Sequence, residues 1–423
     1  MPLDQLRALQ VDRLKDLVQR TWETIPFYQQ AFDKLGIESI NDISSVEDIS
    51  RLPITRKEDL RDHYPFDMFG VSRNQVARVH CSSGTTGKPT VVGFSRADLD
   101  LMGEVNARSL VAAGARPGMM LHNAYGYGLF TGGLGLHSGA EKLGMNVVPV
   151  SGGMTDRQVM LIQDFMPEVI CCTPSYAQRL ADEFEERGID PKALNLRYAV
   201  LGAEPWTETI RTHVEKGLAV TATNIYGLSE IIGPGVSQED YEEKGTGSYI
   251  WEDHFFPEVI DPDTFEPVPY GQTGILLLTT LTKEVMPMIR YCTNDICSLS
   301  YEYSQKRTHI KMSSIRGRAD SMLIIRGVNL FPTQIEEVIG AVTELSANYQ
   351  IVVSSKERLD TILVKVEAMS EDALNPGEKA NLEAQLMTKF RESIGLNIPV
   401  QVESPGTIPR SEGGKLNRVI DLR

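Results

Sequence analysis

The chain has 423 residues, of which 41% are hydrophobic and 23% charged, and its formal net charge is −15. That length exceeds what a single hydrophobic core usually organises, so we expect two or more domains. The acidic balance argues against nucleic-acid and anionic-membrane binding. The chain has no long apolar run and no secretory signal, and its five cysteines form no CxxC pair, so we expect a cytoplasmic protein with reduced thiols and no membrane span.

Helices dominate the first part of the chain and give way to a regular alternation of strands and helices. Residues 1–70 are expected to be mostly helical, and strands alternate with helices between residues 75 and 235. This alternation favours a mostly parallel sheet covered by helices, whose ligands bind in loops at the carboxyl ends of the strands. The strands expected here are 75–81, 91–94, 146–150, 168–172, 198–201 and 219–225, and the helices are 155–166 and 175–188.

The pattern changes twice more along the chain. Residues 245–315 hold short β runs between Pro, Gly and Asp turns, which favours an antiparallel or barrel-like subdomain. After Arg316 the pattern predicts a small α+β domain of about 100 residues. The strands expected after residue 245 are 258–260, 274–280, 296–300, 308–312, 322–325, 349–353, 361–367 and 399–402, and the helices are 332–345 and 378–394.

Two of the expected strands enclose a loop rich in glycine, hydroxyl and lysine side chains: Ser82, Ser83, Gly84, Thr85, Thr86, Gly87 and Lys88. Glycines let backbone N–H groups approach a ligand closely, and hydroxyls and lysine add donors and charge, so the loop suits phosphate. It is not a Walker A motif, because only Thr85 and Thr86 separate the first glycine from the Gly-Lys pair and a strand follows. The alternative is an ordinary surface hairpin, because turns use the same residue types.

Five further segments follow this loop in order: Gly202–Glu204, Tyr226–Glu230, Arg290–Asp295, Ile315–Asp320 and Pro409–Lys415. Together with the loop they resemble the adenylate-forming acyl-CoA synthetase superfamily. The segments similar to its phenylacetate–CoA ligase branch are 124–133, 173–176, 202–206 and 324–332. The resemblance covers essentially the whole chain. One such motif would be weak evidence, whereas six in order are specific.

The resemblance implies an α/β fold with a large N-terminal adenylate-forming domain, residues 1–319, in which mixed α/β sheets are joined to a β-barrel-like subdomain. It implies a small C-terminal α+β lid domain, residues 320–423, that rotates. It also implies ATP, Mg²⁺ and coenzyme A as cofactors and a small aromatic carboxylic acid as substrate. The acid would attack the α-phosphorus of ATP to give an acyl-adenylate and pyrophosphate, and a thiol would then displace AMP.

The same resemblance implies roles for individual residues. Glu230 matches a catalytic Mg²⁺ ligand, Tyr226 an aromatic that lies against adenine, and Asp295 a carboxylate that bonds the ribose hydroxyls. The nucleotide-binding set that it implies is Ser82, Ser83, Gly84, Thr85, Thr86, Gly87, Lys88, Gly202, Ala203, Glu204, Tyr226, Gly227, Asp295, Arg316 and Arg318.

The mobile domain is expected to contribute to both half-reactions. Lys415 matches the catalytic lysine of adenylation, and Asp320 matches the hinge about which the domain turns. Arg326 and Gly327 lie in the loop that would admit the pantetheine of coenzyme A.

Taken one at a time, these residues have structural alternatives. Tyr226 could be a core or turn aromatic, Glu230 could cap a helix that starts near Ser229, and Asp295 could be an Asx-turn residue. Arg316 and Arg318 could pair with surface acids, which would contribute little.

The residues that match an acyl pocket are Tyr125, Tyr127, Phe130, Leu136, Ile225 and Pro234. Aromatic side chains favour a ring-bearing acid. Leu136 stands where we expect alanine in phenylacetate enzymes and adds roughly three methylenes, which favours another aryl or arylacetic acid of smaller or different shape.

Residues 303–309 lack the Cys-x-Cys-Gly that some relatives carry, so we predict no structural zinc and ordinary hydrogen-bonding roles for His254 and His309. We expect coenzyme A as the acyl acceptor, with an amine or a carrier-protein thiol as the alternative. A noncatalytic nucleotide-binding homologue is a second rival. A homodimer would be in keeping with the family, although the sequence carries no interface signal.

Overall fold

The computed structural model describes residues 1–37, 39, 43–81, 89–302, 306–319, 323–325, 328–356, 359–411 and 416–423. The predicted phosphate loop, Ser82–Lys88, lies outside the described residues, as do Asp320, Arg326, Gly327 and Lys415. The chain divides into two compact units. The first comprises residues 1–172, 192–203 and 220–314, and the second comprises residues 173–191, 204–219 and 315–423.

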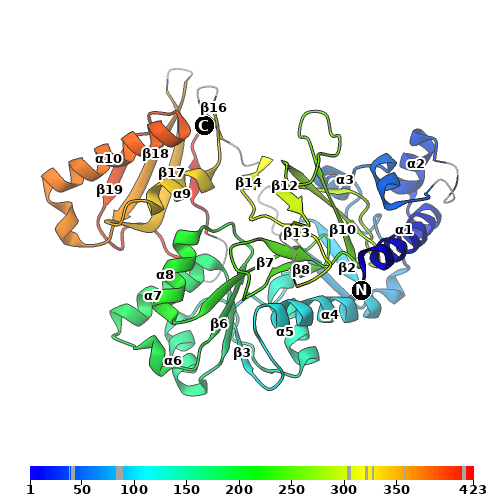
Figure 1. Ribbon diagram of the computed structural model, residues 1–423, viewed down its shortest axis with the longest axis horizontal. Helices are drawn as coiled ribbons and strands as arrows, with labels where there is room; N and C mark the ends of the chain where they lie inside the picture. Colours follow the sequence, from blue (N-terminus) through cyan, green and yellow to red (C-terminus); the bar gives the residue numbers. More distant parts are fainter. Residues whose placement is uncertain are drawn as a thin grey trace. The chain divides into compact units, whose positions relative to one another are not determined.

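One long mixed sheet is the framework of the first unit (Figure 1). Its parallel part runs in the order β4, β3, β5, β6, β7, and its antiparallel part continues through β8, β9, β13, β12, β11 and β10. The parallel strands are β3 (Met120–Asn123), β4 (Asn146–Val148), β5 (Val169–Cys172), β6 (Tyr198–Gly202) and β7 (Thr221–Leu228). The antiparallel strands are β8 (Gly233–Glu239), β9 (Ser248–Ile250), β10 (Phe255–Ile260), β11 (Thr273–Thr280), β12 (Tyr291–Ser300) and β13 (Lys311–Met312).

The parallel strands are apolar because both faces of the sheet are covered. All four residues of β5 are buried, and so is β6 from Ala199 to Gly202. Strands of this kind read as continuous hydrophobic runs, which is how the sequence predicted them. The predicted change to antiparallel pairing after residue 245 is also confirmed, and it begins one strand earlier, at β8.

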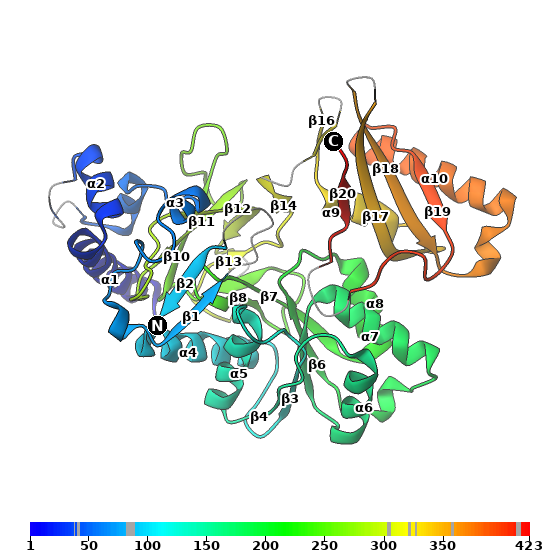
Figure 2. The same ribbon diagram turned by 180° about the vertical axis from the view of Figure 1, so that it is seen from behind.

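Two helices lie along the sheet next to β8. Figure 2 shows α4 (Arg96–Ala112) and α5 (Thr131–Leu143) side by side, and both contact β8. Helix α4 begins at a capping box, in which the Ser95 hydroxyl accepts from the Asp98 N–H and the Asp98 carboxylate accepts from the Ser95 N–H, both at 3.0 Å. The other helices of this unit are α1 (Leu3–Thr24), α2 (Pro26–Leu35), α3 (Lys57–Asp62) and α6 (Thr155–Phe165).

The hairpin of β1 (Arg78–Cys81) and β2 (Val91–Phe94) brackets the predicted phosphate loop in sequence. The two strands pair antiparallel, with Cys81 opposite Val91. Both flanking strands predicted around the loop are therefore confirmed. Within the described residues, no helix is both long and apolar enough to cross a membrane.

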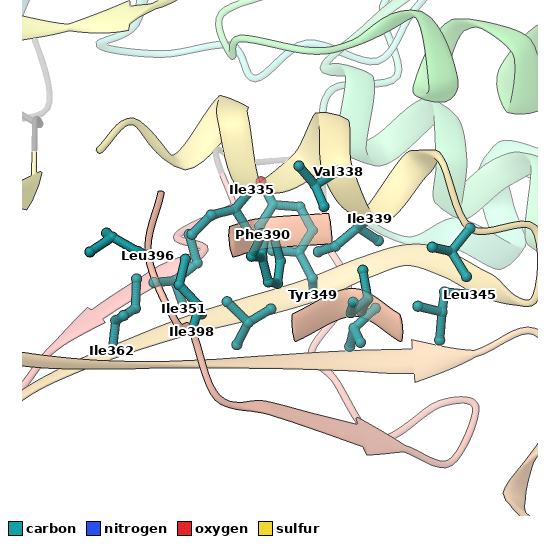
Figure 3. Close-up of a cluster of buried hydrophobic side chains, with 14 of the residues drawn as sticks. Ile335, Val338, Ile339, Leu345, Tyr349, Ile351, Ile362, Phe390, Leu396 and Ile398 are labelled. Atoms are coloured by element: carbon teal, nitrogen blue, oxygen red, sulfur yellow. The ribbon is translucent and has the colours of Figure 1, made fainter. Parts of the chain in front are cut away.

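The second unit contains a four-stranded sheet packed against helices. The sheet order is β19, β18, β17, β20. The four strands of this sheet are β17 (Leu345–Lys356), β18 (Leu359–Ala368), β19 (Val400–Glu403) and β20 (Val419–Asp421). The unit also contains the short strands β14 (Gly317–Arg318), β15 (Leu323–Ile325) and β16 (Val328–Leu330), of which β15 and β16 pair with each other. Its helices are α7 (Pro174–Glu186), α8 (Glu208–Leu218), α9 (Pro332–Gly340) and α10 (Pro376–Ile394). Figure 3 shows Ile335 and Ile339 of helix α9 facing Tyr349 and Ile351 of strand β17. Phe390 of helix α10 lies beside them, and all five side chains are buried.

Several predicted boundaries differ from the structure, and two of the differences have a clear physical reason or bear on the site. The helix expected over 332–345 ends at Gly340, and Leu345 already begins β17, because a glycine and the β-branched Val342 and Thr343 disfavour further helix. The strand expected over 296–300 begins at Tyr291, so the polar residues before Ile296 belong to the strand.

Candidate active site

The ends of β6 and β7 bring the backbone of two predicted motifs together. Gly202 pairs with Ile225, and a Cβ atom on Gly202 would lie 2.1 Å from the Ile225 carbonyl oxygen. A Cβ on Gly227 would lie 1.9 Å from the Gly233 oxygen, so both positions require glycine. Ala203 has a φ of 72°, a left-handed conformation that non-glycine residues rarely adopt. Such strain is concentrated at functional sites.

Tyr226 and Asp295 meet although 69 positions separate them in the sequence. The Tyr226 hydroxyl donates to Asp295 Oδ2 at 2.6 Å. Burial and the nearby Asp295 charge raise the pKa of Tyr226 well above its usual range, so the phenol stays a donor. A carboxylate has several acceptor sites, which is what a pair of ribose hydroxyls requires.

A bulge in β12 sets the position of Asp295. Residues 293–295 of β12 oppose the single residue Leu276 of β11, and Asn294 has a φ of 61°. Thr293 fixes the bulge, because its hydroxyl donates to the Leu276 oxygen at 2.9 Å and accepts from the Asp295 N–H at 3.0 Å. Asp295 therefore lies within a strand, and the Asx-turn alternative is wrong.

Glu230 lies in the turn between β7 and β8. The N–H groups of Ile231 and Ile232 both donate to the Leu228 oxygen, and this turn, residues 229–232, contains no helix, so the helix-cap alternative is wrong. The residue is only 6% exposed, and within the described chain no donor or cation contacts its carboxylate. A carboxylate without a protein partner is available to bind a cation.

Sequence reasoning missed Lys283, which contacts the Glu230 turn. Its Nζ donates to the Glu230 backbone oxygen at 2.9 Å and lies 4.9 Å from the centre of the Phe94 ring. The residue is 0% exposed, and burial lowers its pKa to about 8. The only available signal was a charged pair, Lys283-Glu284, inside an otherwise apolar run.

Three of the predicted acyl-pocket residues share one buried cluster. Tyr125, Leu136 and Ile225 are 7%, 0% and 3% exposed, and they pack with core residues such as Leu121 and Val200. Phe130 is 51% exposed, so the structure does not bring it into this cluster.

Tyr127 and Pro234 both lie against α5. The Tyr127 hydroxyl accepts from Asn123 Nδ2 at 2.8 Å and lies 3.1 Å from His137 Nδ1. Burial raises the pKa of Tyr127 to about 12. A Cβ on Gly135 would lie 2.7 Å from Pro234, so this glycine permits the close approach of β8.

The remaining predicted residues lie in the second unit. The Glu204 carboxylate accepts from the backbone N–H of Ser175 at 3.3 Å and of Leu416 at 2.6 Å, and burial raises its pKa. Arg316 is exposed and its backbone oxygen accepts from Thr333, and Arg318 lies on β14.

His254 and His309 take part in hydrogen bonds, as predicted. His254 Nδ1 lies 2.8 Å from Thr282 Oγ1, and His309 Nδ1 accepts from the Glu252 N–H at 3.2 Å. Burial lowers the pKa of both to about 4. Among the described residues, which omit 303–305, no group of three or more His, Cys, Asp and Glu has a metal-binding arrangement.

Comparisons with known proteins agree with this geometry. The family model of AMP-binding enzymes matches residues 29–287, and that of the AMP-binding enzyme C-terminal domain matches residues 327–423. The phenylacetate–coenzyme A ligase of Thermus thermophilus is 58% identical, with 100% of this chain and 98% of that protein covered. The phenylacetate–coenzyme A ligase of Escherichia coli is 47% identical, with 100% and 96% covered.

The fold also matches a solved ligase. The crystal structure of 2-hydroxyisobutyryl-CoA ligase in the postadenylation state, in complex with 2-HIB-AMP, superposes with a TM-score of 0.92 at 28% identity and covers 100% of this chain and 91% of that one. The chain therefore belongs to the AMP-binding enzyme family and, within it, to the phenylacetate–coenzyme A ligase branch.

Proposed function

We propose that the protein activates phenylacetate, or a closely related arylacetic acid, as its adenylate and transfers the acyl group to coenzyme A. Two relatives named phenylacetate–coenzyme A ligase, at 58% and 47% identity over the whole chain, support the acid and the acceptor. The observation that carries the proposal is the Tyr226–Asp295 pair at 2.6 Å, an aromatic ring and a carboxylate suited to adenine and ribose.

In the first step the acid's carboxylate oxygen forms a bond to the α-phosphorus of ATP, and the bond to the departing pyrophosphate breaks. Negative charge shifts onto the phosphate oxygens, so fixed cations and donors lower the barrier. Lys88 and the loop around it, and Lys415, remain our predictions for this role.

Glu230 fits a Mg²⁺ ion bound together with ATP. Mg²⁺ is commonly held by one or two carboxylates and completed by phosphate oxygens and water, so a single carboxylate without a protein partner suffices. When bound, the ion would neutralise charge on the phosphates. Glu230 would hold it at the mouth of the turn between β7 and β8.

The cluster of Tyr125, Leu136 and Ile225 is our proposal for the wall that receives the aromatic ring. Apolar side chains around a ring exclude water from the carboxylate that must attack. Leu136 is fully buried in the same core cluster as Tyr125 and Ile225.

An AMP-release screen tests the function. The purified protein is incubated with ATP, Mg²⁺ and phenylacetate, benzoate, 4-hydroxyphenylacetate or 2-hydroxyisobutyrate, with and without coenzyme A. We expect the fastest coenzyme A-dependent AMP release with phenylacetate. Pyrophosphate exchange without coenzyme A-dependent turnover would instead favour an amine or carrier-protein acceptor, and no AMP release with any acid would favour a noncatalytic homologue.

Lys415→Ala tests the proposed catalytic lysine. We expect adenylate formation to fall by about 10²-fold, the scale for loss of one charge contact to a transition state. Thioester formation from chemically prepared acyl-adenylate should be largely spared. Equal losses in both half-reactions would contradict the role. The hinge at Asp320, the coenzyme A loop at Arg326 and Gly327, the homodimer and the cytoplasmic location also remain predictions.

A further inference from the structure

Lys283 is a buried cation that lacks a direct carboxylate partner. It is 0% exposed, and among the described residues no carboxylate lies within ion-pair distance of its Nζ. Its direct contacts are the Glu230 backbone oxygen at 2.9 Å and the Phe94 ring at 4.9 Å. Burial lowers its pKa more than the longer-range attraction of Asp98 and Glu230 raises it. An ammonium group removed from water with one neutral acceptor destabilises the fold, so its presence calls for another explanation.

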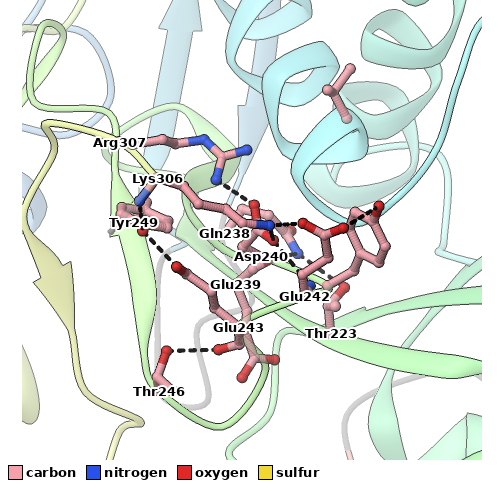
Figure 4. Close-up of polar contacts among 12 residues, drawn as sticks. Thr223, Gln238, Glu239, Asp240, Glu242, Glu243, Thr246, Tyr249, Lys306 and Arg307 are labelled. Carbon is pink, nitrogen blue, oxygen red and sulfur yellow. Dashed lines mark hydrogen bonds and ion pairs between the residues drawn. The ribbon is translucent and has the colours of Figure 1, made fainter. Parts of the chain in front are cut away.

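Lys311 shows how the same fold buries a lysine that has only a structural task. It is 2% exposed, and its Nζ donates to Glu243 Oε2 at 2.8 Å and to Thr246 Oγ1 at 2.7 Å, with the Tyr249 ring 4.7 Å away. Figure 4 shows contacts around Glu243, in which the Tyr249 hydroxyl donates to Glu243 and both Lys306 and Arg307 reach Asp240. The Lys311 ammonium therefore has an opposite charge in direct contact, unlike that of Lys283.

The segment that carries Lys283 is held in place by a different residue. Asp98, in the first turn of α4, accepts from the backbone N–H of Glu284 at 2.7 Å and of Val285 at 3.0 Å. Because this anchor fixes the backbone, the Lys283 side chain is free to act on another group. The group it meets is the main chain of Glu230, and the ring it crosses belongs to β2, the strand that follows the predicted phosphate loop.

We propose that Lys283 is a positioning residue for adenylation, because its ammonium holds the main chain of Glu230 so that the Glu230 carboxylate meets Mg²⁺ and ATP. The inference rests on the proposed role of Glu230 as a Mg²⁺ ligand. Lysine suits the task because its three donors can hold a carbonyl without occupying the carboxylate. Residues that orient a metal ligand typically change metal affinity or activity by about 10- to 100-fold when they are replaced.

The test compares Lys283→Met with Lys311→Met, the same substitution at an equally buried lysine. For each variant, the melting temperature is measured with ATP plus EDTA and with ATP plus Mg²⁺, and the Mg²⁺ dependence of adenylate formation is titrated. We expect Lys283→Met to lose the Mg²⁺-dependent part of the thermal shift and to raise the half-saturating Mg²⁺ concentration by about 10- to 100-fold. Thioester formation from prepared acyl-adenylate should be unchanged. Lys311→Met should lower the melting temperature without ligand and leave the Mg²⁺ dependence as in the parent.

The outcomes separate this inference from the function on which it rests. Glu230→Ala with an unchanged Mg²⁺ dependence would overturn the proposed role of Glu230. Glu230→Ala with a lost Mg²⁺ dependence, together with Lys283→Met that behaves like Lys311→Met, would overturn the role of Lys283 alone. If Lys283→Met does not fold, Lys283→Gln, which keeps one donor group without charge, takes its place in the same measurements. Adding Lys283→Met to Glu230→Ala should cause no further loss in adenylation if the lysine acts through Glu230.

Discussion

The turn that carries Glu230 and the network around Asp240 and Glu243 use charged residues in opposite ways. In the network, two buried charges have opposite charges beside them: Lys311 pairs with Glu243 at 2.8 Å, and Asp240 pairs with the exposed Lys306 at 3.2 Å. In the turn, the buried Lys283 ammonium and the Glu230 carboxylate each lack a direct opposite charge among the described residues. The difference teaches that the paired charges of the network hold the fold, whereas Lys283 and Glu230 in the turn mark, in our proposal, the place where a charged ligand binds.

The strongest challenge to this comparison is Glu243→Ala. The substitution leaves the Lys311 ammonium buried without a carboxylate, so we expect the free energy of unfolding to fall by about 3–5 kcal/mol. Urea denaturation followed by circular dichroism measures it. The folded variant should still form adenylate at the parent rate at low temperature. A midpoint equal to the parent's would show that the network does not hold the fold.

Glu230→Ala is the counterpart in the turn. Because the described chain gives its carboxylate no partner, we expect the urea midpoint to stay the same or rise. Adenylate formation should fall by about 10²- to 10³-fold, the range for loss of one electrostatic contact to a transition state. A large loss of stability with normal activity would reverse the roles assigned to the two regions.

Two matched tyrosines extend the comparison to neutral donors. Tyr226 donates to Asp295 at 2.6 Å in the first unit, and Tyr349 donates to Glu336 at 2.7 Å in the core of the second. We expect Tyr226→Phe to raise the KM for ATP by about 10-fold, since a hydrogen bond to a charged group contributes about 1.5–3 kcal/mol. Tyr349→Phe should lower stability and leave that KM unchanged. Steady-state kinetics at saturating acid and coenzyme A distinguish them, and a KM shift in both would contradict a nucleotide role specific to Tyr226.

A pH dependence of stability from buried histidines gives a further test that does not involve the ligand. In the folded protein burial lowers the pKa of His254 and His309 to about 4, whereas an unfolded histidine titrates near 6.5. The unfolded chain therefore binds more protons than the folded one between pH 6.5 and 4. Because of this difference, the free energy of unfolding falls as the pH drops through that window, by at most about 1.4 kcal/mol per pH unit for each histidine. Above pH 6.5 these histidines cause no pH dependence. Urea midpoints between pH 7.5 and 5 measure the slope, and His254→Gln should reduce it. An equal slope in parent and variant would exclude His254 as its source.

The sequence predicted those features that depend on local pattern. The apolar runs at 168–172 and 198–201 are strands because parallel strands are buried on both faces, and the loops after them carry the predicted motifs. The resemblance to a known family, rather than periodicity, identified Tyr226, Glu230 and Asp295, and the structure pairs the first with the third.

Features that depend on tertiary contacts could not be read from the sequence. The bulge that places Asp295 inside β12 arises from pairing with β11, and nothing local distinguishes it from a turn. Lys283 is informative only because it is buried, and a lone lysine in a sequence is most often a solvated surface charge. The end of α9 did have a local signal, because Gly340 disfavours further helix. The apolar residues after it continue a helical spacing, and this spacing led to the longer predicted helix.

Because of the bulge, it matters whether an odd or an even number of residues is added to or removed from β12. Three residues oppose one, so β12 carries two extra residues, and an even number keeps the inward and outward faces in phase on both sides. Deleting Asn294 alone would turn Ile296, Cys297 and Leu299 each onto the opposite face, because side chains alternate with a period of two. Deleting both Asn294 and Asp295 would keep the alternation of the flanking residues and remove only the bulge. Length variants of this segment should therefore be tolerated in steps of two, with the carboxylate of residue 295 lost but the sheet intact.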